Sequence, residues 1–373
     1  MGGLADYTTR ARRFASRHPI LNHVSPQVSF WITAYILLSF TVHLASVNLA
    51  LSFSVQIETN PWPLLLAGGI TGFLYGCALG LLDYFFDKQF FRNKPLGKII
   101  VLKSFMSLVL LIVCFNFLRF VLYNALLSPA FSKYSPVVND TIWGNLFLIV
   151  VIYSFFMILV ITFVLQVNKK YGPGVLVPLL LGKYREPKEE ERIFMFMDLK
   201  SSTTIAEELG HIRYSSFIRD SFTDINQMLN LYNAEVYQYV GDEIVISWKV
   251  NEKMENMSCV QFFFACEEQF LYRSEYYINK YGLVPCFKAG LHLGKVTAVE
   301  IGEIKRDIAY HGDTLNTAAR IQGMCNQYDK KILISASFTE VTKWNDLFKI
   351  EELGMIMLKG KKLPVGILSV EQV

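Results

Sequence analysis

The chain has 373 residues, of which 52% are hydrophobic, and a formal net charge of +4. This length exceeds one ordinary domain, and the apolar fraction is high for an entirely water-soluble protein. The small positive charge does not indicate a nucleic-acid partner, because basic residues next to the apolar stretches account for it. The six cysteines form neither a CxxC pair nor a zinc-like spacing, so we expect reduced structural thiols.

Four long apolar stretches occupy the first half of the chain. They cover residues 28–49, 62–82, 99–122 and 143–165. A helix needs roughly 20 apolar residues to cross a bilayer. The sequence therefore predicts an all-α transmembrane bundle of four helices within residues 27–167. A signal peptide fits poorly, because the first stretch begins late and is too long.

Basic residues predict how these helices are oriented. Four arginines precede the first stretch, four basic residues lie between the second and third, and Lys169 and Lys170 follow the fourth. The two remaining loops contain only Lys133. Loops rich in lysine and arginine stay in the cytoplasm. We therefore predict a multi-pass protein of the plasma (inner) membrane, with both termini and the C-terminal half cytoplasmic.

A few ionisable residues interrupt the apolar stretches. Lys103, Arg119 and His43 lie within them, and Asp83 directly follows the second. Such residues are costly in a membrane and can mark a ligand site. For Asp83, Lys103 and Arg119 we favour the simpler interpretation, that they lie near helix ends and extend to the membrane interface. For His43 both interpretations remain open.

The cytoplasmic parts differ in composition from the apolar half. Residues 1–26 form a predicted N-terminal segment, and residues 168–191 a linker in which Gly172-Pro173-Gly174 ends the last membrane helix. From residue 192 to 373 the pattern is mixed. The predicted strands cover residues 193–197, 236–240, 244–248, 287–292, 295–301 and 332–335, followed by a final pair that ends at residue 370. The predicted helices cover residues 203–231 and 254–280, then a segment that extends through residue 320, and a short helix after residue 335.

The order of these elements indicates the fold of residues 192–373. Strand, helix, two strands, helix and strand follow one another before further elements are added. This βαββαβ order is typical of a ferredoxin-like, palm-type α+β sheet. We predict that helices cover one face of this sheet.

Two aspartates occupy matching places in the predicted sheet. Asp198 ends the apolar strand that begins at Ile193, and Asp242 lies in the tight turn between the hairpin strands. Carboxylates on strand ends provide the oxygen ligands that Mg²⁺ or Mn²⁺ prefers. A single aspartate of this kind is more often a turn or cap residue, but the pair indicates a site for two divalent cations.

A second set of polar residues follows in Gly312-Asp313-Thr314-Leu315-Asn316-Thr317-Ala318-Ala319-Arg320. Asn316 and Arg320 are four residues apart and would share one helix face. Asp313 is the natural helix cap, which leaves Asn316 available for a ligand. The fixed fork of a guanidinium suits phosphate, although Arg320 could also be a surface charge.

These motifs resemble, in order and spacing, the catalytic domain of class III nucleotidyl cyclases, the family of adenylyl and guanylyl cyclases. The resemblance rests on Asp198, Gly241-Asp242, Asn316 with Arg320, and Lys359-Gly360-Lys361. It covers about half of the chain. It implies a phosphorus–oxygen lyase that converts a nucleoside triphosphate to a 3′,5′-cyclic nucleotide and pyrophosphate with two divalent cations, Mg²⁺ or Mn²⁺.

The resemblance also implies a role for each residue of the motifs. Asp198, Asp242 and the backbone of Leu199 would hold the metals. Asn316 would orient the ribose, and Arg320 would stabilise charge on the α-phosphate. Phosphate binding is implied for the helix start after Asp198 and for one lysine of the later turn. The candidate phosphate-binding residues are Lys200, Ser201, Ser202, Thr203, Lys359 and Lys361.

The two base-reading positions depart from the family pattern. Gln238 stands where adenylyl cyclases have lysine and guanylyl cyclases have glutamate, and Ala309 stands where the partner residue is expected. A glutamine amide both donates and accepts, so it can pair with either purine. Alanine offers no side-chain hydrogen bond. The family favours ATP, and GTP or a pyrimidine triphosphate remain alternatives.

In this family the metal aspartates face the asparagine and arginine across a dimer interface, which implies a homodimer with two equivalent sites. The other implied partners are the nucleotide and the lipid membrane.

Two other interpretations compete. A diguanylate cyclase also has paired carboxylates, but its double glycine and aromatic residue are missing here. A membrane receptor with a silent cyclase-like domain would explain the unusual base pocket, yet every residue for phosphoryl chemistry is present.

Overall fold

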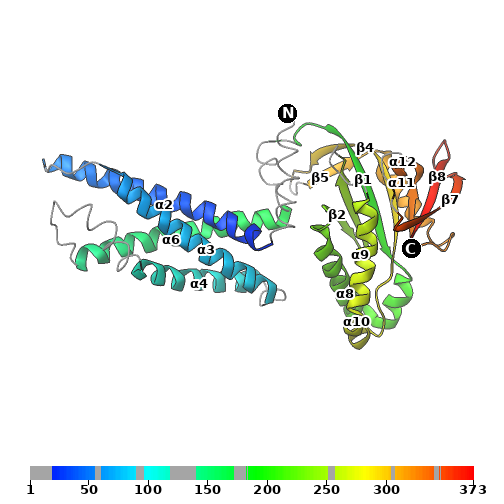
Figure 1. Cartoon of the computed structure of the whole chain (residues 1–373), viewed down its shortest axis with the longest axis horizontal. Helices are drawn as coiled ribbons and strands as arrows, with labels where there is room; N and C mark the ends of the chain where they lie inside the picture. The colour runs from blue at the N-terminus through cyan, green and yellow to red at the C-terminus, as the bar shows by residue number, and fades with distance from the viewer. Residues whose placement is uncertain are drawn as a thin grey trace. The chain divides into compact units, whose positions relative to one another are not determined.

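The computed structural model describes residues 19–54, 60–89, 96–117, 140–171, 182, 184–250, 257–303, 307–339, 344 and 346–373. The described residues form two compact units, one within residues 17–176 and one within 177–373. Figure 1 shows the helices and strands of each unit. The boundary falls in the predicted linker, residues 168–191. Much of that linker and the first 18 residues of the predicted N-terminal segment lie outside the described residues.

Four helices form the first unit: α2 (Pro19–Ser52), α3 (Trp62–Gln89), α4 (Leu96–Phe117) and α6 (Asp140–Tyr171). In the described part of the chain three of them are long and apolar enough to span a membrane, over Ile20–Ser52, Trp62–Phe86 and Gly144–Leu165. Within the described residues the structure therefore has three candidate spans, and not the four predicted. The described part of the third stretch forms the shorter apolar helix Val101–Asn116.

Glycines allow α2 and α3 to pack closely. Gly68, Gly72, Gly76 and Gly80 recur every fourth residue along α3. A Cβ atom on Gly76 would lie only 2.6 Å from the Cα atom of Val28, so the α2 backbone occupies the space of a side chain. Small residues at this spacing are typical of helix pairs in membranes.

Asp83 and Lys103, which we predicted to extend to the membrane interface, pair with one another in the structure. The Nζ atom of Lys103 lies 2.8 Å from Oδ1 of Asp83, and the two side chains are only 13% and 22% exposed. Gln27 donates a hydrogen bond of 2.7 Å to Oδ2 of the same carboxylate. Mutual pairing lowers the cost of placing two charges among apolar helices. Arg119 lies outside the described residues.

The second unit is built around one eight-stranded sheet with the order β2-β3-β1-β4-β6-β8-β7, in which β5 pairs with β4. The chain from its first to its fourth strand gives the predicted ferredoxin-like arrangement, which is confirmed. The elements in chain order are β1 (Lys188–Leu199), α8 (Ser202–Leu229), β2 (Glu235–Val240), β3 (Glu243–Lys249), α9 (Ser258–Tyr272), α10 (Ser274–Tyr281), β4 (Phe287–Ile301), β5 (Asp307–His311), α11 (Asp313–Gly323), β6 (Ile332–Ser335), α12 (Ala336–Thr339), β7 (Phe348–Ile356) and β8 (Val365–Gln372).

Several predicted boundaries differ from the structure. The helix predicted over residues 254–280 is two helices, α9 and α10, which meet at Arg273. Helix α8 is interrupted at Gly210, whose φ of 69° is not helical. The strands predicted on either side of Leu293-Gly294 are one continuous strand, β4, since Gly294 stays extended and pairs with Arg192 of β1. Strand β5 was not predicted.

Helices cover both faces of the sheet, and not one as predicted. Ile193, Met195 and Met197 of β1 belong to the core beneath α8 and α9. Phe194, between them in sequence, packs on the other face with Ala318 of α11. Side chains alternate between the faces of a strand, so an apolar run without polar interruptions is buried on both sides.

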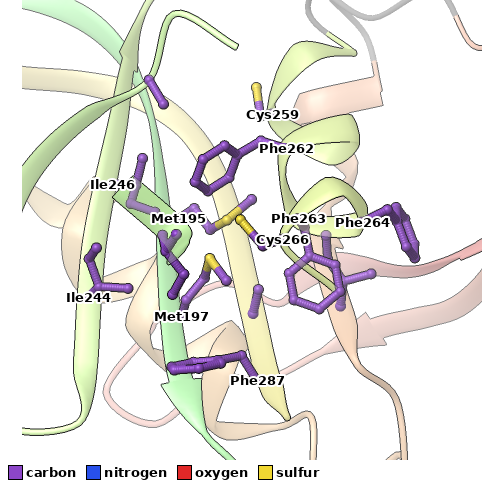
Figure 2. Close-up of a cluster of buried hydrophobic side chains, with 14 of the residues drawn as sticks. Met195, Met197, Ile244, Ile246, Cys259, Phe262, Phe263, Phe264, Cys266 and Phe287 are labelled. Atoms are coloured by element: carbon purple, nitrogen blue, oxygen red, sulfur yellow. The ribbon is translucent and has the colours of Figure 1, made fainter. Parts of the chain in front are cut away.

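The core beneath α8 and α9 fixes the strands β1 and β3. Figure 2 shows Met195 and Met197 of β1 beside Ile244 and Ile246 of β3, with Phe262 and other side chains of α9 packed against them. These residues are fully buried. Burying one such side chain contributes about 1.5–3 kcal/mol. The ends of β1 and β3 are therefore held rigidly, which matters because both predicted metal ligands lie there.

A glycine in β4 allows α11 to pack closely against the other face of the sheet. A Cβ atom on Gly290 would lie 2.2 Å from the backbone nitrogen of Gln322, so no larger residue fits there with the helix in place. The helix turns Thr317, Ala318 and Ile321 toward the sheet, all of which are fully buried.

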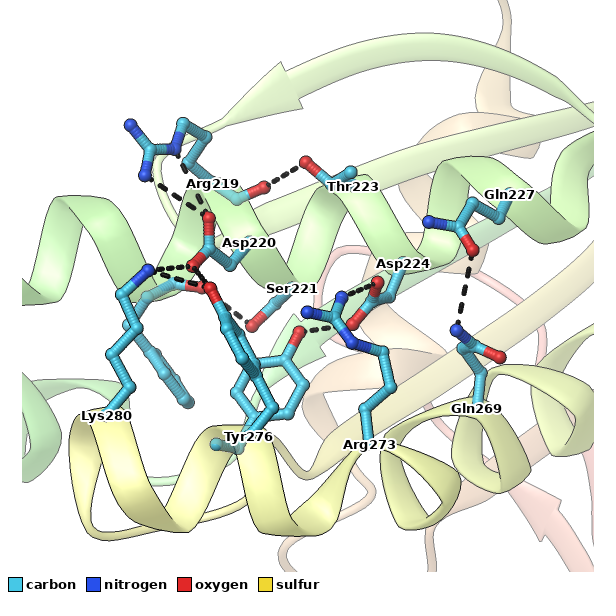
Figure 3. Close-up of polar contacts among 12 residues, drawn as sticks. Arg219, Asp220, Ser221, Thr223, Asp224, Gln227, Gln269, Arg273, Tyr276 and Lys280 are labelled. Atoms are coloured by element: carbon cyan, nitrogen blue, oxygen red, sulfur yellow. Dashed lines mark hydrogen bonds and ion pairs between the residues drawn. The ribbon is translucent and has the colours of Figure 1, made fainter. Parts of the chain in front are cut away.

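Ion pairs and hydrogen bonds connect α8 to α10 (Figure 3). The carboxylate of Asp224, which is fully buried, pairs with Arg273 and accepts a hydrogen bond of 2.5 Å from the Tyr277 hydroxyl. Asp220, one turn earlier, accepts a hydrogen bond of 2.8 Å from Lys280. These contacts hold α10 in place after the break at Arg273.

Replacing Asp224 with alanine is expected to destabilise the second unit by about 3 kcal/mol, because the half-buried Arg273 loses its ion pair and the buried Tyr277 hydroxyl loses its acceptor. Urea unfolding of the full-length protein in nanodiscs, followed by fluorescence, measures this change. Arg219→Ala is the matched control, since Arg219 is 65% exposed in its pair with Asp220. It should change stability by less than about 1 kcal/mol. Equal effects of the two variants would contradict the assigned role of Asp224.

Candidate active site

Strand pairing places Asp198 and Asp242 at the same corner of the sheet. Asp198 pairs with Glu243 in the antiparallel register of β1 and β3, so the turn that contains Asp242 lies beside the end of β1. This turn consists of Gly241 and Asp242 alone. Gly241 has a φ of 63°, which glycine adopts without strain at the first position of a two-residue hairpin turn. The two carboxylates predicted as metal ligands are thus brought together.

Negative charge accumulates at this corner. Burial raises the pKa of Asp198, and the neighbouring charge of Asp242 raises it further, while Lys288 acts in the opposite direction. Lys288 Nζ lies 3.2 Å from Oδ2 of Asp198. Burial and the charges of both aspartates raise the pKa of Glu243 to about 7. One lysine therefore balances only part of the charge of three carboxyl groups.

The chemistry of this corner fits a divalent cation. Oxygen ligands in a region of uncompensated negative charge are what Mg²⁺ and Mn²⁺ bind, commonly through one or two carboxylates completed by substrate phosphates. Within the described residues, no group of three or more His, Cys, Asp or Glu side chains is arranged to hold a metal ion. Phosphate oxygens would have to complete the coordination. Leu199 is buried, so only its backbone carbonyl could take part.

The chain after β1 offers backbone N–H groups to an anion. Lys200 donates its own N–H to the Cys286 carbonyl (2.8 Å). Ser201 then adopts a left-handed conformation with φ of 57°, and its side chain does not cap α8. The first N–H groups of a helix have no partner within the helix. The side chains of Lys200, Ser201 and Thr203 are exposed, and that of Ser202 is half-buried, as an anion site requires.

The second predicted set lies together on α11 and the turn before β8. Asn316 is exposed and Arg320 is half-buried. Gly360 lies against the Arg320 guanidinium, since a Cβ atom there would be 3.4 Å from Nη2. Lys361 forms an ion pair with Asp313, and this contact lowers the pKa of the Asp313 carboxyl. The structure thus gathers an amide, a guanidinium and lysine ammonium groups.

Lys359 and Lys361 flank Gly360 in the same turn. Lys359 is exposed, while Lys361 is half-buried against Asp313. Leu358, which is 2% exposed, anchors the turn in a small core with Ile321 of α11. Both lysines therefore remain candidates for binding a terminal phosphate.

The two sets do not meet within one chain. Among the contacts of the described residues, none joins Asp198 or Asp242 to Asn316 or Arg320. The link between the regions is Gln322, whose Nε2 donates a hydrogen bond of 3.2 Å to Asp198 from the sheet-facing side of α11. Asn316 and Arg320 are on the remaining side of that helix. Each chain therefore presents two separate halves of the predicted site.

Comparison with known proteins identifies the second unit. Residues 185–368 match the family model described as the adenylate and guanylate cyclase catalytic domain. Over 209 residues the chain is 35% identical to adenylate cyclase 2 of Rhizobium meliloti (strain 1021), an alignment that covers 56% of this chain and 58% of the relative. It is 25% identical over 194 residues to guanylate cyclase 2D of Rattus norvegicus, covering 51% of this chain and 17% of the relative.

The C-terminal half of the chain belongs to the class III nucleotidyl cyclase family. The chain spans little more than half the length of the first relative. Among solved structures, the adenylyl cyclase CyaB from P. aeruginosa has 19% identity and a TM-score of 0.44, with 50% of this chain and 97% of that chain covered.

In this cyclase domain the two predicted base-reading residues are not in contact. Gln238 is exposed on β2, just after an irregularity in its pairing with β3, and Ala309 is buried on β5. Their sequence neighbours Tyr237 and Tyr310 do meet, with ring centroids 5.1 Å apart. The assignment of Gln238 and Ala309 to the base stays a prediction.

Arg192 is a buried residue of the cyclase domain that was not among the predicted site residues. It is 2% exposed and lies 4.6 Å above the ring of Tyr310. Its guanidinium donates to Glu190 (2.9 Å), Glu235 (3.1 Å) and Ser247 (3.1 Å). The available signal was an arginine directly before the apolar run that begins at Ile193. Lys288 and Gln322 were also missed, because their contacts with Asp198 depend on long-range register.

Glu243→Gln is expected to raise the melting temperature of the cyclase domain at pH 8 in metal-free buffer, but not near pH 4.5. The folded protein keeps the Glu243 proton until the pH reaches a pKa of about 7, whereas the ordinary value is 4.5. The folded state therefore binds more protons than the unfolded state between these values, and wild-type stability falls as the pH rises through them. Glutamine carries no titratable proton and avoids this loss.

Thermal unfolding of the full-length protein at several pH values checks this expectation. Glu208→Gln, a substitution of an exposed glutamate on α8, is the control. A Glu243→Gln gain that is the same at pH 4.5 and pH 8 would show that charge repulsion at this corner is not its cause.

Proposed function

We propose that this chain is a membrane-anchored nucleotidyl cyclase that converts ATP to 3′,5′-cyclic AMP and pyrophosphate at the interface of a homodimer. The observation that carries the proposal is the pair of separate half-sites. One half offers paired carboxylates and a free helix start, and the other offers Asn316, Arg320 and a lysine turn. A symmetric dimer would join the half-sites of two chains and give two equivalent sites.

Each half-site would contribute a different part of the chemistry. The ribose 3′-oxygen bonds to the α-phosphorus, the bond from that phosphorus to the bridging oxygen of the β-phosphate breaks, and pyrophosphate leaves while the hydroxyl proton passes to water. Arg320 of one chain would stabilise charge on the α-phosphate, and Asn316 would orient the ribose. Lys359 or Lys361 would hold the terminal phosphates. Asp198 and Asp242 of the other chain would hold two divalent cations, which lower the pKa of the hydroxyl and neutralise the pyrophosphate.

ATP is the preferred substrate of this proposal because a relative at 35% identity is an adenylate cyclase. GTP is the second candidate, since a relative at 25% identity is a guanylate cyclase. Gln238 could pair with either base by rotating its amide. Ala309 contributes no side-chain hydrogen bond.

The proposed location is the inner membrane, with the catalytic half in the cytoplasm. Three helices of suitable length and composition support the membrane anchor. Lys169 and Lys170, at the end of α6, support a cytoplasmic position for the chain that follows.

The direct test is turnover by the full-length protein in nanodiscs with Mn²⁺ and ATP, GTP, CTP or UTP offered separately. Mass spectrometry should detect cyclic AMP as the main product. Asp242→Ala should reduce it at least about a thousandfold while the protein stays folded, because a metal ligand is lost. Folded wild-type protein that makes no cyclic nucleotide from any of the four would favour a silent receptor domain instead.

Subunit mixing tests the shared site. Asp242→Ala and Arg320→Ala should each be inactive alone, but their co-expression should restore about a quarter of wild-type turnover, since half of the dimers are mixed and each has one intact site. Co-expression of two differently tagged Asp242→Ala chains is the control. Activity in the mixture no higher than in the separate variants would place a complete site within one chain.

A further inference from the structure

A polar cluster lies among the apolar helices of the first unit. Lys103 pairs with Oδ1 of Asp83, and Gln27 donates a hydrogen bond to Oδ2 of the same carboxylate. Trp31 Nε1 in turn donates a hydrogen bond of 3.1 Å to Oε1 of Gln27. Ionisable groups at such positions are rare and commonly mark a ligand site or pathway. Here three helices position the cluster through specific contacts.

A cavity of about 250 Å³ opens beside this cluster, lined by residues of α2, α3, α4 and α6. One part of its lining is polar and includes Gln27, Asp83 and Lys103. Another part is apolar and includes Trp31, Ile158 and Ile161. The volume lies just below the roughly 300 Å³ at which pockets for drug-sized ligands begin, so the cavity suits a small molecule.

The charges that line the cavity define the chemistry of its ligand. Asp83 and Lys103 cancel one another, so a ligand with a net charge would leave a charge uncompensated in an apolar surrounding. Besides their present contacts, the carboxylate can accept a further hydrogen bond and the ammonium can donate one. The apolar wall needs a hydrocarbon body.

We propose that this cavity binds a small amphiphile whose head is uncharged and offers a hydrogen-bond donor and acceptor together, such as an alcohol. The head would contact Asp83 and Lys103, and the hydrocarbon part would pack on Trp31 and the isoleucines of α6. The wall of α2 and α3 is rigid because Gly72 and Gly76 allow their backbones to touch. This site does not depend on the catalytic proposal.

The test uses an octanol that carries a photoreactive diazirine, added to the full-length protein in nanodiscs at pH 8. Peptide mapping after irradiation should place the label on cavity-lining residues of α2 and α6. Excess 1-octanol should remove this label, whereas octanoate and octylammonium at the same concentration should not. This comparison uses only the wild-type protein, so it does not depend on the folding of any variant.

A cavity-filling variant and a matched control complete the test. Ser107→Phe places a ring in the cavity, because Ser107 lines it, and should lower labelling about tenfold. Val109→Phe adds the same ring to an exposed position of the same helix and should leave labelling unchanged. Label spread over lipid-facing residues, or unaffected by Ser107→Phe, would show that no amphiphile binds in the cavity. Equal competition by octanoate or octylammonium would overturn the preference for an uncharged head.

Discussion

Burial of β1 on both faces is the constraint on which the rest of the cyclase domain depends. The strand lies between β3 and β4 at the middle of the sheet. Met195 faces the helices α8 and α9, and Phe194 faces α11. A shift of one residue would exchange the two faces and bring each large side chain into the wrong core. The register of β1 is therefore fixed, and with it the position of Asp198 at its end.

The first half of β1 is held by charge as well. The buried guanidinium of Arg192 contacts Glu235 at the start of β2, Ser247 of β3 and the ring of Tyr310 in β5. A buried charge stabilises little by itself, because desolvation offsets the attraction, but an unpaired one is costly. Arrangements of β2, β3 and β5 that lose these partners are therefore disfavoured. Backbone pairing places the strands that carry Gln238 and Ala309, and Arg192 adds side-chain contacts that favour this arrangement.

Local pattern was enough to predict the central fold, and it identified the motifs on which the proposed half-sites depend. The apolar run before Asp198 and the alternating strands around Gly241 are signals within a few residues of sequence. Strand β5 has no such signal, because it is short and begins with Asp307. The break at Arg273 contains neither glycine nor proline, and tertiary contacts with Asp224 stabilise it. These features depend on residues distant in sequence.

The same limit applies to polar side chains among the membrane-type helices. Asp83 and Lys103 are 20 positions apart in different helices, and each alone fits an interfacial residue. Only the packing of α3 and α4 shows that they pair. The glycines of α3 were visible in the sequence at a regular spacing, and attention to small residues would have predicted the close contact with α2.

Helix α11 connects the two halves of the proposed catalytic arrangement. Its sheet-facing side sends Gln322 to Asp198 of its own chain, and its other side presents Asn316 and Arg320. In the proposed dimer, that second side would serve the aspartates of the partner. A displacement of α11 would therefore alter the metal ligand of one site and the phosphate-binding residues of the other at once. Gly290 allows the backbone of α11 to contact β4 directly, so a displacement of α11 requires the sheet to move with it. In the proposed dimer this helix would therefore couple the two equivalent sites mechanically.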